Sequence, residues 1–142
     1  MKINTIIELI IGPPVVGEES WTKNFAIWLG MLRVAFAAFI IIVSLKATMS
    51  IFSPEYAISW GFRPAELSTL GMFEIISAVG FSSLRTKLCG AAGLLIAFVI
   101  AMFTYLRHSI LPWHILGYAI VVVGLTWGTL WVERKRIKLD TL

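Results

Sequence analysis

The sequence predicts an all-α fold, an antiparallel four-helix transmembrane bundle with a short N-terminal interfacial helix. Hydrophobic residues make up 58% of the 142 residues and charged residues only 14%, whereas soluble domains are about 45–50% apolar and about 25% charged. The mean hydropathy of the chain is +0.88. The apolar residues stand in long runs, and a helix needs about 20 of them to cross a hydrocarbon core. Four runs approach or reach that length, at residues 25–49, 67–84, 88–106 and 113–132.

These runs divide the chain into three parts. We expect residues 1–24 to form a cytoplasmic interfacial segment, residues 25–132 the four-helix membrane domain, and residues 133–142 a basic cytoplasmic tail. The four spans use nearly all of the chain, so no second domain is expected.

The N-terminal segment does not have the pattern of a cleavable signal peptide. Its apolar run is short, contains Glu8 and ends at Pro13 and Pro14 without a small-residue cleavage site. Four isoleucines follow helical spacing, which predicts a helix lying on the membrane surface: Ile3, Ile6, Ile7 and Ile10. A tail without regular structure is the alternative.

Prolines and short polar turns separate the spans. The longest loop, IFSPEYAISWGFRPAE, contains a short helix whose start is indicated by Ser53 followed by Pro54, because serine caps a helix and proline suits its first position. The second span begins at Pro64 or Ala65, and SSLRTK is a tight turn to the third span. The loop HSILPWH leads to the fourth, with Pro112 in its first turn.

Basic residues flank the spans mainly on one side. With an even number of spans, the N-terminal segment, the turn between the second and third spans, and the C-terminal tail share a side, and these carry Lys2, Lys23, Arg85, Lys87, Arg134, Lys135, Arg136 and Lys138. The positive-inside rule places this side in the cytoplasm. We therefore expect an integral protein of a bacterial or archaeal plasma membrane with both termini cytoplasmic. This placement of the charges excludes nucleic acid as the partner and favours membrane lipid.

Three charged residues fall inside the spans: Arg33, Lys46 and Glu74. A charge at the bilayer centre costs about 2.5–3.5 kcal/mol, so it needs a partner or a task. From a rise of about 1.5 Å per residue, Lys46 and Glu74 lie within one or two turns in depth, and Lys46 is the first choice of partner. Arg33 is the alternative partner, because its long side chain could reach Glu74 from a deeper level, but it lies on a different face of the helix from Lys46.

Glu74 has three interpretations. It is an ion-pair partner that locks the first span to the second, a protonated acid hydrogen-bonded inside the bundle, or a ligand-site carboxylate that accepts a proton from a quinone.

An outer polar layer is expected at the ends of the third and fourth spans, from Arg107, His108 and His114. Two histidines on neighbouring helices suggest haem or metal ligation. Both lie at the membrane surface, however, and no other histidine completes a site, while Cys89 is the single cysteine. We expect no metal site and no haem there. The sequence also has no nucleotide-binding loop, nucleophile motif or paired acids, so no catalytic residue is assigned.

Two stretches carry a resemblance to a known family. LRVAFAAFIIIVSLKATM has an arginine early and a lysine late, and GMFEIISAVGFSSLRTKLCGAAGLLIAF has an early acid, a short basic turn and a helix rich in small residues. This pattern, over residues 32–125, resembles the DoxX-like family of four-helix membrane proteins. The matched positions are Arg33, Lys46, Glu74 and Arg85. Ser44 departs from the pattern, because a small glycine is expected near it.

The resemblance implies a respiratory setting, since family members are named for an archaeal terminal quinol oxidase and for thiosulfate:quinone oxidoreductase subunits. We therefore expect a non-catalytic accessory subunit of a quinone-linked membrane redox complex. It would give packing surface to other membrane subunits and form part of a quinone or lipid site. The alternatives are an assembly module without a ligand, and a small carrier or enzyme with a site inside the bundle.

Overall fold

The computed structural model describes residues 20–109 and 111–140, and this part of the chain is helical between its turns, with no strand. The long helices are α2 (Ser20–Thr48), α4 (Pro64–Ser82), α5 (Lys87–Arg107) and α6 (Trp113–Asp140). A 3-10 turn, η1 (Met49–Ile51), and the short helix α3 (Pro54–Ser59) connect α2 to α4. The predicted all-α class is confirmed. The predicted surface helix falls in residues 1–19, outside the described residues, while residues 20–24 begin α2.

Helix α6 differs from the expectation at its C-terminal end. The basic residues assigned to a separate tail continue the helix without a break to Asp140. A helix has no need to stop where the lipid stops, because its backbone hydrogen bonds are internal. The change from apolar to charged residues therefore does not predict the end of the helix.

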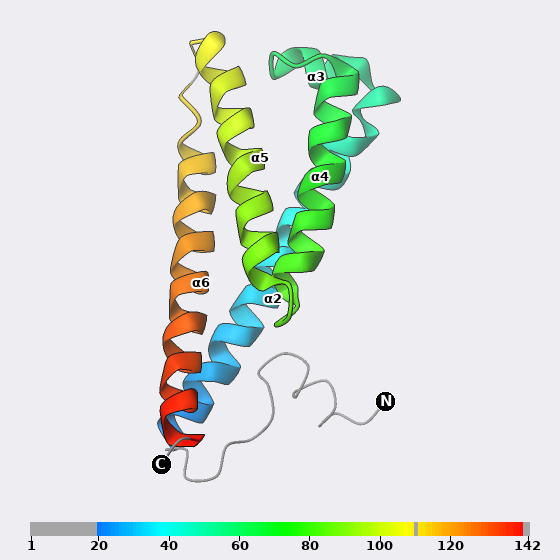
Figure 1. The fold of residues 1–142 in the computed structure, drawn as a ribbon. Helices are drawn as coiled ribbons and strands as arrows, with labels where there is room; N and C mark the ends of the chain where they lie inside the picture. The colour runs from blue at the N-terminus through cyan, green and yellow to red at the C-terminus, as the bar shows by residue number, and fades with distance from the viewer. Residues whose placement is uncertain (1–19, 110, 141–142) are drawn as a thin grey trace.

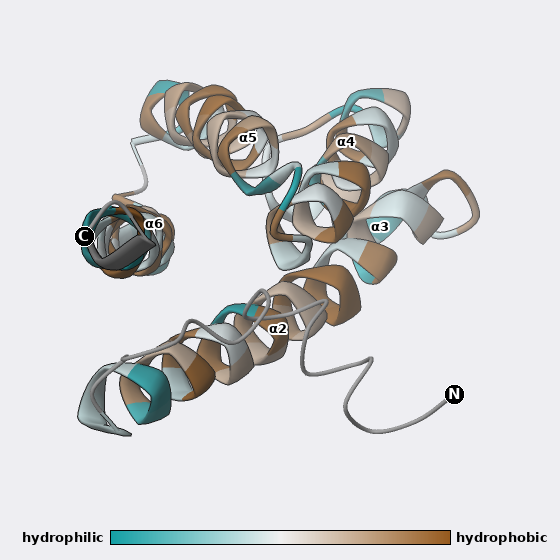
Figure 2. Cartoon of the chain, turned by 60° about the horizontal axis from the view of Figure 1, so that its bottom comes forward, coloured by the Kyte–Doolittle hydropathy of each residue, from teal (hydrophilic) through white to brown (hydrophobic). Residues whose placement is uncertain are grey.

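Three helical segments of the described chain are long and apolar enough to cross a membrane: Ser20–Ile51, Lys87–Arg107 and Trp113–Lys138. In Figure 2 apolar residues run along α5 and hydrophilic colours gather at its ends. The second predicted span corresponds to α4, which does not qualify. It has 19 residues, and Glu66, Glu74 and four serines or threonines dilute its apolar content. The chain thus has the helices of an integral membrane protein, three rather than four by this criterion.

The long helices contact one another in a closed order, with α4 between α2 and α5, and α6 between α5 and α2. Successive long helices alternate in direction, and α2 crosses obliquely behind the others, from the C-terminal end of α6 to the N-terminal end of α4 (Figure 1). Helices α2 and α6 extend past the short turn between α4 and α5 (Figure 1). The regular bundle of four spans remains a prediction.

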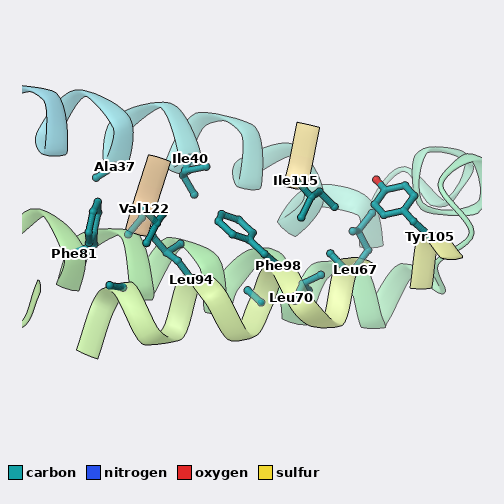
Figure 3. Packing of buried hydrophobic residues seen from close by; sticks show 14 of the residues in the cluster. Ala37, Ile40, Leu67, Leu70, Phe81, Leu94, Phe98, Tyr105, Ile115 and Val122 are labelled. Atoms are coloured by element: carbon teal, nitrogen blue, oxygen red, sulfur yellow. The ribbon is translucent and has the colours of Figure 1, made fainter. Parts of the chain in front are cut away.

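The core is a single cluster to which all four long helices contribute. Figure 3 shows Phe81 of α4 pointing toward Ala37 of α2, and Phe98 of α5 pointing toward Ile40 of α2. Five side chains of α4, α5 and α6 in the core have no exposed surface: Ala78, Phe81, Leu94, Ala97 and Val122. Most other large apolar side chains on these helices are exposed, as a lipid-facing surface requires.

Glycines bring α4 and α5 into backbone contact. A Cβ atom placed at Gly90 of α5 would lie 2.1 Å from the backbone nitrogen of Phe81, and one at Gly93 would lie 2.3 Å from Ser77 Oγ. Small residues allow this close packing between membrane helices, where burial from water gives no driving force. The α4–α5 contact therefore depends on the missing side chain at these two positions.

We expect Gly90→Ala to destabilise the fold by about 1–3 kcal/mol, the usual cost of overpacking. Gly124→Ala is the matched control, because a Cβ atom there would meet no described atom within 4 Å. This control should change the stability by less than about 1 kcal/mol, mainly through helix propensity. Thermal unfolding followed by circular dichroism in mild detergent measures both variants. Equal melting temperatures would contradict the close α4–α5 contact.

Candidate functional site

A cavity lies beneath α3, and we call it the α3 cavity. Its volume is about 110 Å³, and α2, α3, α4, α5, α6 and the segment between α3 and α4 all contribute to its walls. For comparison, an apolar protein cavity of about 150 Å³ binds benzene. The α3 cavity therefore has the size of one small ring or a few waters.

Aromatic rings form much of its wall. Trp60 and Tyr105 lie with ring centroids 5.7 Å apart, Tyr105 and His114 5.8 Å apart, and His114 and Tyr118 5.9 Å apart. Their planes meet at 84°, 88° and 68°, which is the edge-to-face geometry that ring quadrupoles favour. The first pair joins the residue after α3 to α5, the second joins α5 to α6, and the third lies within α6.

Glu74 supplies the carboxylate of this cavity, and no other acidic residue is among the described residues that line it. Its side chain is half-buried, and the Ser44 hydroxyl of α2 donates a hydrogen bond of 2.5 Å to its Oε2 atom. One turn earlier, a Cβ atom at Gly71 would lie 2.8 Å from the carbonyl oxygen of Ser44. The absence of a side chain at Gly71 thus lets α4 approach α2 closely enough for this bond.

Two further hydrogen bonds join α4 to the α2–η1 segment above Glu74. The Ser68 hydroxyl donates to the carbonyl oxygen of Thr48 at 2.7 Å, and the Ser50 hydroxyl donates to the carbonyl oxygen of Pro64 at 2.9 Å. We call these two bonds and the Ser44–Glu74 bond the α2–α4 polar seam. A bond between neutral groups across membrane helices contributes about 0.6 kcal/mol on average, whereas a bond to a charged group contributes about 1.5–3 kcal/mol.

The expected ion pair between Lys46 and Glu74 does not form. Lys46 is exposed, and the hydrogen-bond partner of Glu74 is Ser44, two residues earlier on α2. Side chains two positions apart on a helix do not face the same neighbour, so only one of these two residues can point at α4. The similar depth of Lys46 and Glu74 does not predict a contact between them, because depth does not give the direction of a side chain.

Arg33 does not lie beside the α3 cavity. Its side chain is only 1% exposed and borders a second, smaller cavity of about 20 Å³, together with Leu84, Glu133 and Arg136. Glu133 lies close enough to interact favourably with its charge, and Lys87 Nζ donates to Glu133 Oε1 in a salt bridge. We call Arg33, Lys87, Glu133 and Arg136 the basic cluster. It lies at the level of the α4–α5 turn, away from Glu74.

The three residues of the expected outer polar layer have different neighbours. His114 lines the α3 cavity, and Arg107 is exposed in the last turn of α5. His108 packs against Gly61, which has a positive φ of 78°, and a Cβ atom there would lie 2.3 Å from the His108 ring. Within residues 20–109 and 111–140, no three His, Cys, Asp or Glu side chains gather as a metal site would require.

Sequence reasoning missed Tyr105 and Tyr118, because each stands inside an apolar run. A signal for Tyr105 is present in the sequence. Gly93, Ala97, Ala101 and Tyr105 recur every fourth residue and therefore lie on one face of α5. Small residues on one face of a helix indicate close contact with a neighbouring helix. A tyrosine at the end of that face indicates that the helices are farther apart there, with room for the tyrosine ring.

Comparison with protein-family models, with curated proteins and with solved structures found no match to this chain. The resemblance to the DoxX-like family therefore stays a prediction.

We expect Ser44→Ala to destabilise the fold by about 1.5–3 kcal/mol, because Glu74 would lose the donor that compensates its burial. Ser82→Ala is the control, since the Ser82 hydroxyl donates within its own helix to the carbonyl oxygen of Val79 and is exposed. Unfolding in mild detergent measures both. Equal losses of unfolding free energy in the two variants would show that the Ser44–Glu74 bond contributes no more than a hydrogen bond within one helix.

Lys46→Gln should change the free energy of unfolding by less than about 0.5 kcal/mol, as exposed substitutions usually do. The reason is that Lys46 makes no ion pair with Glu74. The same unfolding measurement tests this expectation. A loss as large as that of Ser44→Ala would restore Lys46 as the partner.

Proposed function

We propose that this protein is an integral membrane subunit that binds a small ring compound of the quinone class in the α3 cavity. Its role is that of a non-catalytic accessory subunit in a membrane redox assembly. The observation that carries the proposal is a ring-sized cavity walled by aromatic side chains and containing one carboxylate, Glu74.

The chemistry of the wall suits such a ring. Aromatic edges and faces provide apolar contacts for a flat ring. The hydroxyl groups of Tyr105 and Tyr118 are donors for a quinone carbonyl, and the Glu74 carboxylate is an acceptor for a quinol hydroxyl. Ligand sites typically combine a mainly apolar lining with a few polar groups of this kind.

A groove next to the cavity offers a place for an apolar tail. It has a volume of about 570 Å³ and runs between α4 and α5, lined mostly by apolar side chains that include Phe73, Ile96 and Ile100. Leu70 belongs to the walls of both the groove and the α3 cavity. A ring in the cavity with its tail in the groove fits a membrane-soluble quinone. The redox setting comes from the sequence resemblance.

The proposal includes α4 as a fourth crossing, with both termini in the cytoplasm of a bacterium or archaeon. The α2–α4 polar seam supports the crossing, because polar groups enter the membrane when they find partners on a neighbouring helix. The orientation is supported by the basic residues around the α4–α5 turn and the end of α6.

A second candidate function is an assembly module in which Glu74 only holds α4 against α2. The Ser44–Glu74 bond and the close approach at Gly71 favour it, since both join the same two helices. The two candidates differ in what the α3 cavity contains. They also differ in their response to Glu74→Gln, because the amide still accepts the Ser44 hydrogen bond but carries no charge.

Binding of a short-tailed benzoquinone in nanodiscs tests the leading proposal. Ala101 lines the α3 cavity, so Ala101→Leu fills part of it and should weaken binding at least about tenfold, equivalent to about 1.4 kcal/mol. Ala38→Leu, at an exposed position of α2, should leave binding unchanged. Glu74→Gln should also weaken binding, whereas Glu55→Gln, at an exposed position outside both the cavity and the groove, should not. Isothermal titration calorimetry measures all four variants.

Lack of saturable binding by the wild-type protein would overturn the quinone site. So would equal affinities of Ala101→Leu and Ala38→Leu. If Glu74→Gln preserves both the fold and subunit assembly while no quinone binds, the assembly module is the better account.

A further inference from the structure

The α3 cavity has the chemistry of a site for a positively charged ligand. We propose that it binds a small organic cation, an alkylated amine, whose charge pairs with the Glu74 carboxylate. This ligand class differs from a quinone, and its binding does not depend on quinone binding. The two ligands would use the same cavity and would exclude each other.

Glu74 lacks a cationic partner among the residues that the structure describes. Its Oε2 atom accepts a hydrogen bond from the Ser44 hydroxyl, which is neutral. Lys46 is exposed and makes no ion pair with Glu74, and no arginine or lysine is among the described residues that line the cavity. A half-buried carboxylate interacts strongly with a nearby opposite charge, because the dielectric constant around it is low. A positively charged ligand would therefore form an ion pair that the protein itself does not supply.

Aromatic rings line the cavity together with Glu74. The Tyr56 and Trp60 ring centroids lie 6.4 Å apart with their planes at 65°, and the Trp60 and His114 centroids lie 6.4 Å apart with their planes at 68°. The Trp60 and Tyr105 planes meet at 84°. Because neighbouring planes are steeply inclined, the ring faces point in several directions. Ring faces are electrically negative, and groups of aromatic rings bind alkylated ammonium ions. Rings and a carboxylate in one cavity therefore favour a cation over a neutral ligand of the same size.

The size and the polar groups of the cavity favour an organic cation over a metal ion. A volume of about 110 Å³ suits one compact group such as trimethylammonium, since a cavity of about 150 Å³ binds benzene. Metal ions such as Ca²⁺ and Mg²⁺ need about six oxygen ligands, whereas Glu74 is the one carboxylate in the described lining. The methyl groups of an alkylated amine need apolar contacts instead, and most of the lining is apolar or aromatic.

The cavity is open at its α3 end. Tyr56 and Trp60 line it and are 37% and 36% exposed, and His114 lines it and is exposed as well. A water-soluble cation therefore reaches the cavity from the α3 end without passing through the buried core.

The test compares a charged ligand with a neutral ligand of the same shape. Choline is compared with its uncharged carbon analogue, in which a tert-butyl group replaces the trimethylammonium group. The full chain is kept in dodecyl maltoside, which carries neither charge nor choline groups, and isothermal titration calorimetry measures both affinities. We expect choline to bind at least about tenfold more tightly than the analogue, because only choline gains the ion pair and the attraction to the ring faces.

Two pairs of variants separate the contributions of charge and rings. Glu74→Gln still accepts the Ser44 hydrogen bond but carries no charge, so the preference for choline should fall to about threefold or less, the part due to the rings. Glu55→Gln, at an exposed position outside the cavity, should keep the full preference. Trp60→Leu should weaken choline binding about fivefold and change binding of the analogue less. Trp113→Leu, 72% exposed and outside the lining, should change neither.

A third pair locates the bound cation. Ala101→Leu fills part of the cavity and should weaken choline binding about tenfold or more, whereas Ala38→Leu, at an exposed position of α2, should not. The proposal is overturned if wild-type protein does not bind choline or binds it no more tightly than the analogue. Equal choline affinities of folded Glu74→Gln and Glu55→Gln, or of Ala101→Leu and Ala38→Leu, would overturn it as well. If Glu74→Gln fails to fold, the Trp60 and Ala101 pairs decide.

The quinone titration is measured separately, so the two proposals fail in different ways. Choline binding without quinone binding would remove the proposed function and retain the cation site. Quinone binding without a preference for choline over its analogue would retain the proposed function and remove the cation site.

Discussion

The hydrogen bond from Ser44 to Glu74 is the interaction on which the arrangement of the helices depends. Helix α4 is the long helix that falls outside the candidate membrane spans, and the half-buried acid that it carries needs a hydrogen-bond partner. Ser44 provides it, and Gly71 removes the side chain that would keep the two helices apart. Helix α5 then packs on α4 through Gly90, so its position follows from that of α4.

The charged residues that line the two cavities differ in prevailing sign. The cavity beneath α3 contains an acid among aromatic rings, while the far end gathers arginines and lysines around Glu133. This separation keeps Glu74 away from the cations that would hold it in a simple ion pair. A carboxylate bonded to a hydroxyl is less firmly satisfied than one bonded to a guanidinium. Glu74 therefore keeps acceptor capacity for a second partner.

Much of the fold could be predicted from the sequence, because apolar runs and prolines are local signals. The runs located α2, α5 and α6, and Ser53 with Pro54 located α3. The prediction that Lys46 is the partner of Glu74 is wrong, because the rise per residue gives the height of a residue along the helix but not the direction of its side chain. Arg33 lies away from Glu74, at the smaller cavity beside Glu133, and the residue spacing along the sequence does not show which residues of helix α6 reach it. The tyrosines of the α3 cavity were missed because their role arises only when three helices meet.

The backbone contact at Gly90 has a mechanical consequence. Helices α4 and α5 touch near the turn that joins them and diverge toward α3 (Figure 1). The distance along α4 from this pivot to Pro64 is about 24 Å, from a rise of about 1.5 Å per residue. A rotation of about 5° at the pivot would therefore displace the far end of α4 by about 2 Å, on the scale of one atom. A small change of the angle between α4 and α5 at Gly90 would therefore move the part of α4 that forms one wall of the α3 cavity.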